Sequence, residues 1–365
     1  MSQRAWIATR KGLFQLLLDT HAGGPAAWRI ASSSFIGEPV SMVLPGSSTH
    51  PMIAALNLGH FGVKCHASDD WGDSWHEIAT PAYPPQPEDA QDEVAWKLVQ
   101  IWSLAAADGV IWAGTLPGGL FSSKDCGATW HLNESLWDRP ERLGWFGGGY
   151  DTPGIHSICI DPRDAKRMLL GISCGGAWLT QNGGLSWELR AKGMNATYMP
   201  PDRADEQNIQ DPHAIAQCAG APDTLWCQHH NGIWRSTDAG ASWQEIKAPL
   251  SSFGFAVAAH PTDPNTAWFV PASADQQRVP VDGALCVNRT SDGGKTFETL
   301  RTGLPQKDCY DLVYRHGLAV SNDGRHLMMG STTGNLWASA DAGETWQNIS
   351  SNLPPIYAVR FEATS

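Results

Sequence analysis

The stretch Ser68–Trp75, with the sequence SDDWGDSW, decides the fold because its pattern recurs along the chain. The pattern is a small hydroxyl residue, any residue, Asp, any residue, Gly, any residue, Ser or Thr, and an aromatic residue. Such a phrase is typical of a turn that closes a β-hairpin, since the Asp accepts hydrogen bonds from the turn N–H groups and the Gly adopts a positive φ. The further copies are Ser123–Trp130, Thr180–Trp187 (with Asn182 in place of Asp), Ser236–Trp243, Thr290–Phe297 and Ser339–Trp346.

The spacing of these copies predicts a ring of similar units. Their closing aromatic residues lie 55, 57, 56, 54 and 49 residues apart, and Trp28, 47 residues before Trp75, marks a further unit whose Asp phrase has decayed. Seven units of roughly 50 residues, each with room for four short strands, predict an all-β, seven-bladed β-propeller. We expect a single domain over 1–365, with blades at 3–33 plus 355–362, 38–80, 96–134, 154–191, 212–248, 253–300 and 309–349.

The two ends of the chain predict how the ring closes. The N-terminal segment supplies three strands of its blade but lacks the innermost one, whereas Ile356–Glu362 is a strand with no blade of its own. Pairing the two completes the first blade and removes exposed edge strands. The length alone would allow two α/β domains, but the repeat argues against them. In the fourth blade the expected strands, from the innermost outward, are His156–Ile160, Met168–Ile172, Ala177–Thr180 and Ser186–Arg190.

Composition narrows the classes of partner. The net charge of −12 argues against nucleic acid, because no basic stripe is present. No apolar stretch approaches the ~20 residues that span a bilayer, so no membrane partner is expected. The eight cysteines form no C-x-x-C pair and no signal peptide precedes them, which favours reduced thiols and the cytoplasm of a bacterium.

Loop lengths indicate which face of the propeller carries a site. The Asp phrases and the other short turns share one face, and the long connections fall on the opposite face. Loops longer than about 12–15 residues are usually functional or disordered. We therefore expect a binding site on the face of the long connections, which are Thr80–Ala95, Glu134–Pro153, Lys192–Asp211 and Pro271–Gly283.

Histidines gather on that same face. His156 and His213 begin the innermost strands of two neighbouring blades, and His60 and the pair His229–His230 lie at corners between the second and third strands. Several imidazoles at one opening predict a divalent metal ion (Zn, Fe, Cu or Ni), held by His60, His156, His213 and His230. Two alternatives stay open: His156 and His213 bind substrate or act in acid–base catalysis, or the histidines only cap strand ends.

Other residues complete the candidate site. Arg10 and Lys11 would hold an anionic substrate, or form ordinary salt bridges at the rim. Tyr310, expected to start the innermost strand of the seventh blade, is a further catalytic candidate. Trp145 and Tyr150 flank a glycine run that suits a lid contacting the substrate. Carboxylates that precede innermost strands are candidate general acids or bases, Asp151 first among them: Glu38, Glu93, Asp151 and Asp211.

The six phrases resemble the Asp box of the BNR-repeat proteins, which include sialidases, sortilin-type receptors and photosystem assembly factors. The segments ATRKGLF, GHFG, WDRPER, GIHSI, FGFAVAAHP and LPPIYAVRF resemble a group of bacterial BNR-repeat proteins labelled sialidase-like or glycosyl hydrolase. The resemblance implies a propeller and a hydrolase-like activity. It does not imply a true sialidase, because Thr9–Gly12 reads TRKG where sialidases carry an Arg-Ile-Pro motif, and because seven blades are counted against their six.

Two classes of function follow. The first is an enzyme of hydrolase or lyase type, with or without a metal, acting on a small polar or anionic substrate such as a glycoside. The second is a non-catalytic propeller that binds a protein or a cofactor during assembly.

Overall fold

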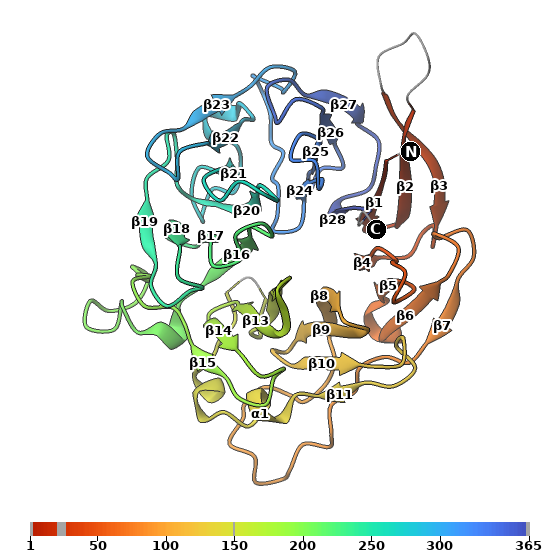
Figure 1. The fold of residues 1–365 in the computed structure, drawn as a ribbon, viewed down its shortest axis with the longest axis vertical. Helices are drawn as coiled ribbons and strands as arrows, with labels where there is room; N and C mark the ends of the chain where they lie inside the picture. The colour runs from red at the N-terminus through yellow and green to blue at the C-terminus, as the bar shows by residue number, and fades with distance from the viewer. Residues whose placement is uncertain (1–2, 20–26, 149, 363–365) are drawn as a thin grey trace.

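Seven four-stranded antiparallel sheets stand in a ring around a central axis (Figure 1), which confirms the predicted seven-bladed β-propeller. The computed structural model describes residues 3–19, 27–148 and 150–362. Within these residues, helix is confined to α1 (Glu134–Trp137) and the 3-10 turns η1 (Gly59–Phe61), η2 (Pro140–Gly144), η3 (Gln207–Ile209) and η4 (Val281–Gly283).

Each blade runs from an innermost to an outermost strand. The first sheet contains β28 (Ile356–Phe361), β1 (Arg4–Thr9), β2 (Gly12–Asp19) and β3 (Ala27–Ser34), and the second contains β4 (Val40–Leu44), β5 (Met52–Asn57), β6 (Val63–Ser68) and β7 (His76–Ile78). The third contains β8 (Gln100–Ala107), β9 (Val110–Leu116), β10 (Leu120–Ser123) and β11 (His131–Leu132), and the fourth contains β12 (Ile155–Asp161), β13 (Asp164–Ile172), β14 (Gly176–Thr180) and β15 (Glu188–Leu189). The fifth contains β16 (Pro212–Gln217), β17 (Leu225–His229), β18 (Gly232–Ser236) and β19 (Gln244–Ile246). The sixth contains β20 (Gly254–Ala259), β21 (Ala267–Pro271), β22 (Val287–Thr290) and β23 (Glu298–Leu300), and the seventh contains β24 (Leu318–Val320), β25 (Leu327–Gly330), β26 (Leu336–Ser339) and β27 (Gln347–Ser350).

The C-terminal strand closes the ring as predicted. β28 pairs antiparallel with β1, with Ile7 opposite Val359, and the two ends of the chain lie together in Figure 1. Beyond the ladder, the N–H of Glu362 donates to the carbonyl of Arg4 at 3.0 Å. The pairing supplies the inner edge of the first blade with backbone partners, so closure needs no further element.

The repeated phrase forms the turn that its residues predict. The carboxylate of Asp70 accepts the N–H of Ser74 at 2.8 Å, the hydroxyl of Ser68 accepts the N–H of Gly72 at 2.8 Å, and Gly72 has φ 93°. The closing tryptophan links neighbouring blades, since the indole N–H of Trp130 donates to the carbonyl of Ala79 in the preceding connection at 2.9 Å. The phrase therefore shapes the hairpin and ties one blade to the next.

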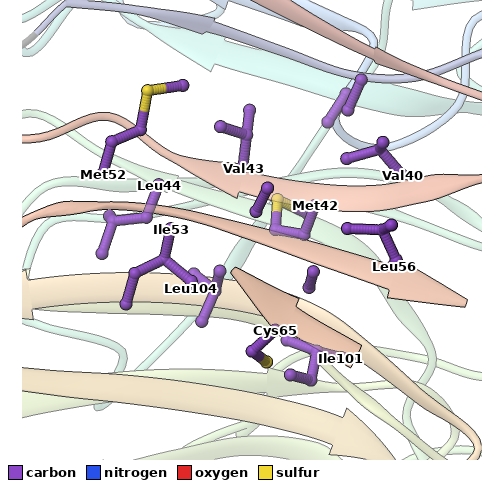
Figure 2. Packing of buried hydrophobic residues seen from close by; sticks show 14 of the residues in the cluster. Val40, Met42, Val43, Leu44, Met52, Ile53, Leu56, Cys65, Ile101 and Leu104 are labelled. Carbon is purple, nitrogen blue, oxygen red and sulfur yellow. The ribbon is translucent and has the colours of Figure 1, made fainter. Parts of the chain in front are cut away.

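The hydrophobic core lies between blades. All five residues of β4 are buried, because both faces of this inner strand pack against neighbouring sheets. Figure 2 shows Val43 and Met42 of β4 beside Ile53 of β5, with Ile101 and Leu104 of β8 in the next blade. Apolar side chains from strands of the second blade and from the adjacent sheet thus fill this gap, and the ring positions the loops at its two faces.

The seventh blade differs from the expectation. Its innermost strand is only Leu318–Val320, and Tyr310, which the sequence placed at the start of that strand, lies well before it with 68% of its surface exposed. The preceding segment is held elsewhere: the carbonyl of His316 accepts the N–H of Val359 at 2.8 Å, and His316 forms a parallel bridge with Ala358. This attachment to β28 leaves the segment irregular and places its side chains at the channel.

All eight cysteines are free thiols, consistent with the expected reduced state. No helix among the described residues is long and apolar enough to cross a membrane. The cytoplasmic location stays a prediction.

Candidate functional site

A cavity of about 880 Å³ opens at one mouth of the channel, lined by the long connections and by the starts of the innermost strands. Aromatic side chains form much of its wall: Phe61, Trp102, Tyr150, Phe255, Tyr314 and Tyr357. Charged and titratable groups are interspersed among them: Glu38, His213, Arg278, Arg315 and His316. Its size falls within the range of about 300–1,000 Å³ typical of small-molecule sites.

A recurrent β-bulge aims side chains into this cavity. The ladder between the first two strands of a blade skips one residue near the start of the innermost strand in several blades, for example between Pro212 and Ala214. A bulge leaves the extra residue unpaired and redirects its side chain. The skipped residues that line the cavity are Ser41, Trp102, His213, Phe255 and Tyr357, and His156 occupies the same place in the fourth blade.

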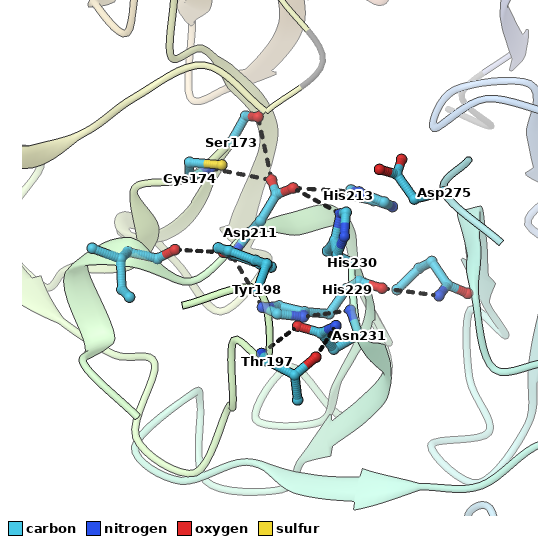
Figure 3. A network of polar contacts seen from close by, with 12 residues as sticks. Ser173, Cys174, Thr197, Tyr198, Asp211, His213, His229, His230, Asn231 and Asp275 are labelled. Carbon is cyan, nitrogen blue, oxygen red and sulfur yellow. Dashed lines mark hydrogen bonds and ion pairs between the residues drawn. The ribbon is translucent and has the colours of Figure 1, made fainter. Parts of the chain in front are cut away.

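Three potential ligand groups converge beside the cavity (Figure 3). The Oδ2 atom of Asp211 lies 3.4 Å from Nε2 of His213 and 3.6 Å from Nδ1 of His230. These atoms all lie within 4.8 Å of one another. The β16–β17 hairpin brings them together, because Asp211 and His213 flank the first residue of β16 and His230 follows β17, with its N–H donating to the carbonyl of Asp211 at 3.0 Å.

Surrounding groups orient these side chains. The other oxygen of Asp211, Oδ1, accepts the N–H of Cys174 at 3.1 Å and the hydroxyl of Ser173 at 3.3 Å. Nδ1 of His213 lies 2.7 Å from the carbonyl of Gly254, a contact in which only the nitrogen can donate. Burial opposes the charge of Asp211, but His213, His230 and Arg315 outweigh it and hold the pKa of this carboxyl well below its usual range. Burial lowers the pKa of His213.

A buried guanidinium in the wall forms no ion pair with any residue that the structure describes. Arg315 is 8% exposed, and its Nε atom has no hydrogen-bond partner among the described residues. The cation lies over the ring of Trp102 at 4.6 Å and near that of Phe255 at 5.8 Å. Burial lowers the pKa of Arg315, while the nearby charge of Asp211 opposes that shift. Arg278, the second arginine of the lining, is paired with Asp275.

The glycine run after Trp145 packs directly on the cluster. A Cβ atom on Gly148 would lie 2.9 Å from Oδ2 of Asp211 and 2.9 Å from the hydroxyl oxygen of Ser173. Only glycine allows the backbone this close to the carboxylate. Tyr150 follows, with its ring 5.2 Å from that of Trp102, at the rim of the cavity. The backbone at Gly148 therefore lies directly against Asp211.

The structure brings together only part of the predicted histidine set. His213 and His230 meet at Asp211, whereas His60 is exposed in η1 with its ring 3.8 Å from that of Phe61. His156 is buried beneath the cavity and does not belong to the cluster; burial lowers its pKa well below the usual value. His229 is fixed structurally, since its Nε2 accepts the N–H of Asp211 at 3.0 Å.

The structure likewise places only some of the other predicted site residues at the main cavity. Tyr150 lines the cavity, and the exposed side chains of Arg10 and Lys11 lie outside its lining. Trp145 and Asp151 line a second cavity of about 560 Å³, and the indole N–H of Trp145 donates to Asn208 at 2.9 Å. Exposed Tyr310 is also absent from the main cavity.

Arg278 and Arg315 were missed as site residues. Arg278 lies in a long connection, which was the available signal for it. Arg315 follows the expected start of the innermost strand of the seventh blade, and the sequence could not tell in which direction its side chain points. Glu38, considered only as one of several carboxylates, is the sole acidic residue of the lining among the described residues.

The chain is similar in part to xyloglucanases. A segment of 116 residues, 30% of this chain, is 35% identical to the xyloglucanase Xgh74A of Acetivibrio thermocellus and spans 13% of that enzyme. A longer match of 267 residues, 63% of this chain, is 22% identical to a xyloglucanase of Paenibacillus sp. and spans 24% of it. The chain thus covers far less than two thirds of these relatives. No family model matches.

Solved structures share the fold at low identity. An ancestral GH74 enzyme matches with a TM-score of 0.59 at 16% identity, over 89% of this chain and 38% of the other. YCF48 bound to D1 peptide matches with a TM-score of 0.55 at 12% identity, over 88% and 86% of the two chains. A putative 6-phosphogluconolactonase from Bacteroides fragilis matches with a TM-score of 0.60 at 11% identity, over 99% and 98%. These similarities concern the propeller and carry no activity.

Proposed function

We propose that the protein is a carbohydrate-processing enzyme, a glycoside hydrolase or a lyase, that binds a sugar bearing a carboxylate in the channel-mouth cavity. The partial similarity to xyloglucanases supports the carbohydrate class. The observation that supports a carboxylate on the substrate is Arg315, a buried cation of the wall that has no ion pair within the described part of the chain.

The aromatic wall suits a sugar ring. Tyr150 and Tyr357 stand partly exposed at the rim, and Trp102 lies deeper in the cavity. Aromatic side chains present large apolar faces at low conformational cost, and the apolar C–H face of a pyranose packs on such surfaces. Hydroxyl groups of the sugar would remain free for the polar lining residues.

The charges of the lining residues favour a substrate that bears a single carboxylate. Arg278 is already paired with Asp275, so Arg315 is the arginine left for a ligand among the described residues of the lining. One guanidinium binds one carboxylate through two parallel hydrogen bonds. A phosphate carries about −1.5 to −2 charges and would leave part of its charge uncompensated in this buried wall.

Glu38 is the residue that would act in acid–base catalysis. Its carboxyl lines the cavity from the connection between β3 and β4, on the exposed side of the site. A positioned carboxyl group can protonate a leaving oxygen or remove a proton beside a carboxylate, and contributes typically about 10²–10⁴-fold to a rate. His213 faces Asp211 through Nε2, which leaves Glu38 the better-placed group for proton transfer.

Binding and turnover test the proposal separately. Titration with D-glucuronate, followed by tryptophan fluorescence, is expected to show binding at least about tenfold tighter than that of D-glucose, the value of one charge-assisted hydrogen bond. Arg315→Met should remove this preference, and Arg10→Met, outside the lining, should keep it. Equal affinity for the two sugars in the wild type would overturn the assignment of Arg315.

Hydrolysis is measured with 4-nitrophenyl β-D-glucuronide and with the matching glucoside, by release of nitrophenol. Elimination is measured with a 4-linked oligouronide, in which the sugar on O4 is the leaving group, by appearance of an unsaturated uronate. Glu38→Gln is expected to lower the rate about 10²-fold or more while glucuronate still binds. Asp151→Asn, in the second cavity, serves as the matched carboxylate control. Glucuronate binding without any turnover by the wild type would refute the enzyme and favour the non-catalytic class.

A further inference from the structure

We infer that Asp211, His213 and His230 form a mononuclear site for a divalent transition-metal ion. The ligand atoms are Oδ2 of Asp211, Nε2 of His213 and Nδ1 of His230, which all lie within 4.8 Å of one another. The role of such an ion in catalysis rests on the proposed function above, whereas its binding can be measured independently.

The geometry of His213 suits a metal ligand. Its Nδ1 donates to the carbonyl of Gly254, which leaves Nε2 as the ring nitrogen that faces Oδ2 of Asp211 at 3.4 Å. A metal ion between these two atoms would be bound by the lone pair of Nε2 and by the carboxylate oxygen. Metal-bound histidines usually donate their second nitrogen to a carbonyl or a carboxylate, as His213 does.

The carboxylate is arranged in the same manner. Hydrogen bonds from Cys174 and Ser173 occupy Oδ1 of Asp211, and Oδ2 is left facing the two imidazoles. Figure 3 shows Asp211 at the centre of this network, with the two rings on one side and the backbone of Cys174 on the other. Because these hydrogen bonds already hold Oδ1, the carboxylate of Asp211 loses little conformational freedom when Oδ2 binds a metal.

Three protein ligands leave positions open toward the cavity. His213 itself lines the cavity, and the side chain of His230 is 21% exposed, so a substrate oxygen or a water molecule can reach the same centre. Two imidazoles and one carboxylate favour Zn²⁺, Fe²⁺ and related ions over Mg²⁺ or Ca²⁺, which prefer oxygen ligands. Such an ion would polarise a substrate oxygen or lower the pKa of a bound water.

The neighbouring histidines do not complete the site. His229 accepts the N–H of Asp211 at Nε2, at 3.0 Å, and is committed to the hairpin. His60 projects from η1 and is exposed. His60 therefore offers a matched control: it is a histidine of the same face that the sequence places among the ligands and the structure places elsewhere.

The test is metal binding to the full chain purified without a His tag. Elemental analysis and titration of the apo protein with Zn²⁺ and Co²⁺ are expected to give one equivalent, with a visible Co²⁺ spectrum. His213→Ala should weaken Zn²⁺ binding by more than about 100-fold, because even a group behind the ligands is worth about 10–100-fold. His60→Ala should bind as the wild type does.

A second variant guards against misfolding of the first. His230→Gln alters the more exposed ligand, and it should lose the Co²⁺ spectrum while its thermal melting stays close to that of the wild type. Less than a stoichiometric amount of metal taken up by the wild type at micromolar Zn²⁺, or equal losses in His60→Ala and His213→Ala, would overturn the site. Glucuronate binding by the metal-free protein is read separately, so failure of the metal site and failure of the carbohydrate proposal are distinguishable.

Discussion

Replacing Arg315 with methionine is expected to stabilise the folded protein while it removes the preference for a carboxylate. Methionine keeps a long, flexible side chain in the same space but carries no charge. Arg315 is 8% exposed and forms no ion pair among the described residues. A buried charge without a partner opposes folding, because its loss of hydration is not repaid by a carboxylate.

The magnitude follows from the contacts of the guanidinium. Removing an ion from water costs several kcal/mol even after relaxation. The contacts with the rings of Trp102 at 4.6 Å and Phe255 at 5.8 Å return about 1–2 kcal/mol each when desolvated. A methionine sulfur beside the same rings recovers about 1 kcal/mol of that loss. The net gain in the free energy of unfolding on substitution is therefore about 1–2 kcal/mol.

Urea denaturation followed by tryptophan fluorescence measures this difference. Arg142→Met is the matched control, since Arg142 is buried, lies 3.9 Å over the ring of Trp137 and is paired with Asp92. Breaking that pair leaves a buried carboxylate alone and should cost about 3–5 kcal/mol. A destabilisation of Arg315→Met by about 1 kcal/mol or more would refute the reasoning and give Arg315 a structural role instead.

Three further outcomes are expected. Ile356→Ala, at the start of the closing strand and 2% exposed, should lower the free energy of unfolding by about 3 kcal/mol in the same assay; a loss below about 1 kcal/mol would contradict a tightly packed closure. Hydrogen bonds from Thr129 lower the pKa of Asp125 to about 2. The ionised carboxylate therefore stabilises the folded state fully at neutral pH, and this stabilisation is lost as the pH falls from about 4 toward 2. Asp125→Asn, which copies Asn182, should flatten the acid limb of a stability–pH curve, and an unchanged limb would argue against this account. Gly148→Ala should weaken Zn²⁺ binding, because the new Cβ would lie 2.9 Å from Oδ2 of Asp211. An unchanged Zn²⁺ titration would show that the backbone at this position moves to accommodate the methyl group.

The turns of the propeller were readable from the sequence because their contacts are local. Asp70 and Ser74, joined at 2.8 Å, are four residues apart, and the glycine with positive φ lies between them. The same bonds recur wherever the phrase recurs, so the six phrases, together with the unit at Trp28, predicted seven blades. The innermost strand of the seventh blade could not be predicted in this way. The segment around His316 bonds to Ala358 and Val359 of β28, which lie more than 40 residues further along the chain.

The site was readable only in outline. The positions of His213 and His230 on the face of the long connections could be inferred from the order of strands, and the structure does bring the two rings to Asp211. His60 belongs to the same face, yet the 3-10 turn at Gly59–Phe61 carries it away from the cluster. The difference depends on a turn of three residues, which no pattern in the sequence marks.

What the sequence by itself determined is the ring: seven hairpin-closed units, their order, and the joining of the first and last strands, all of which depend on repeated contacts over a few residues and on one unpaired edge. Tertiary structure alone decided the chemistry of the channel mouth. A β-bulge at His213 turns this side chain toward Asp211, and Arg278 pairs with Asp275 whereas Arg315 pairs with no carboxylate of the described residues. These outcomes depend on which charges meet across neighbouring blades, a property of distances between segments that are remote in the chain.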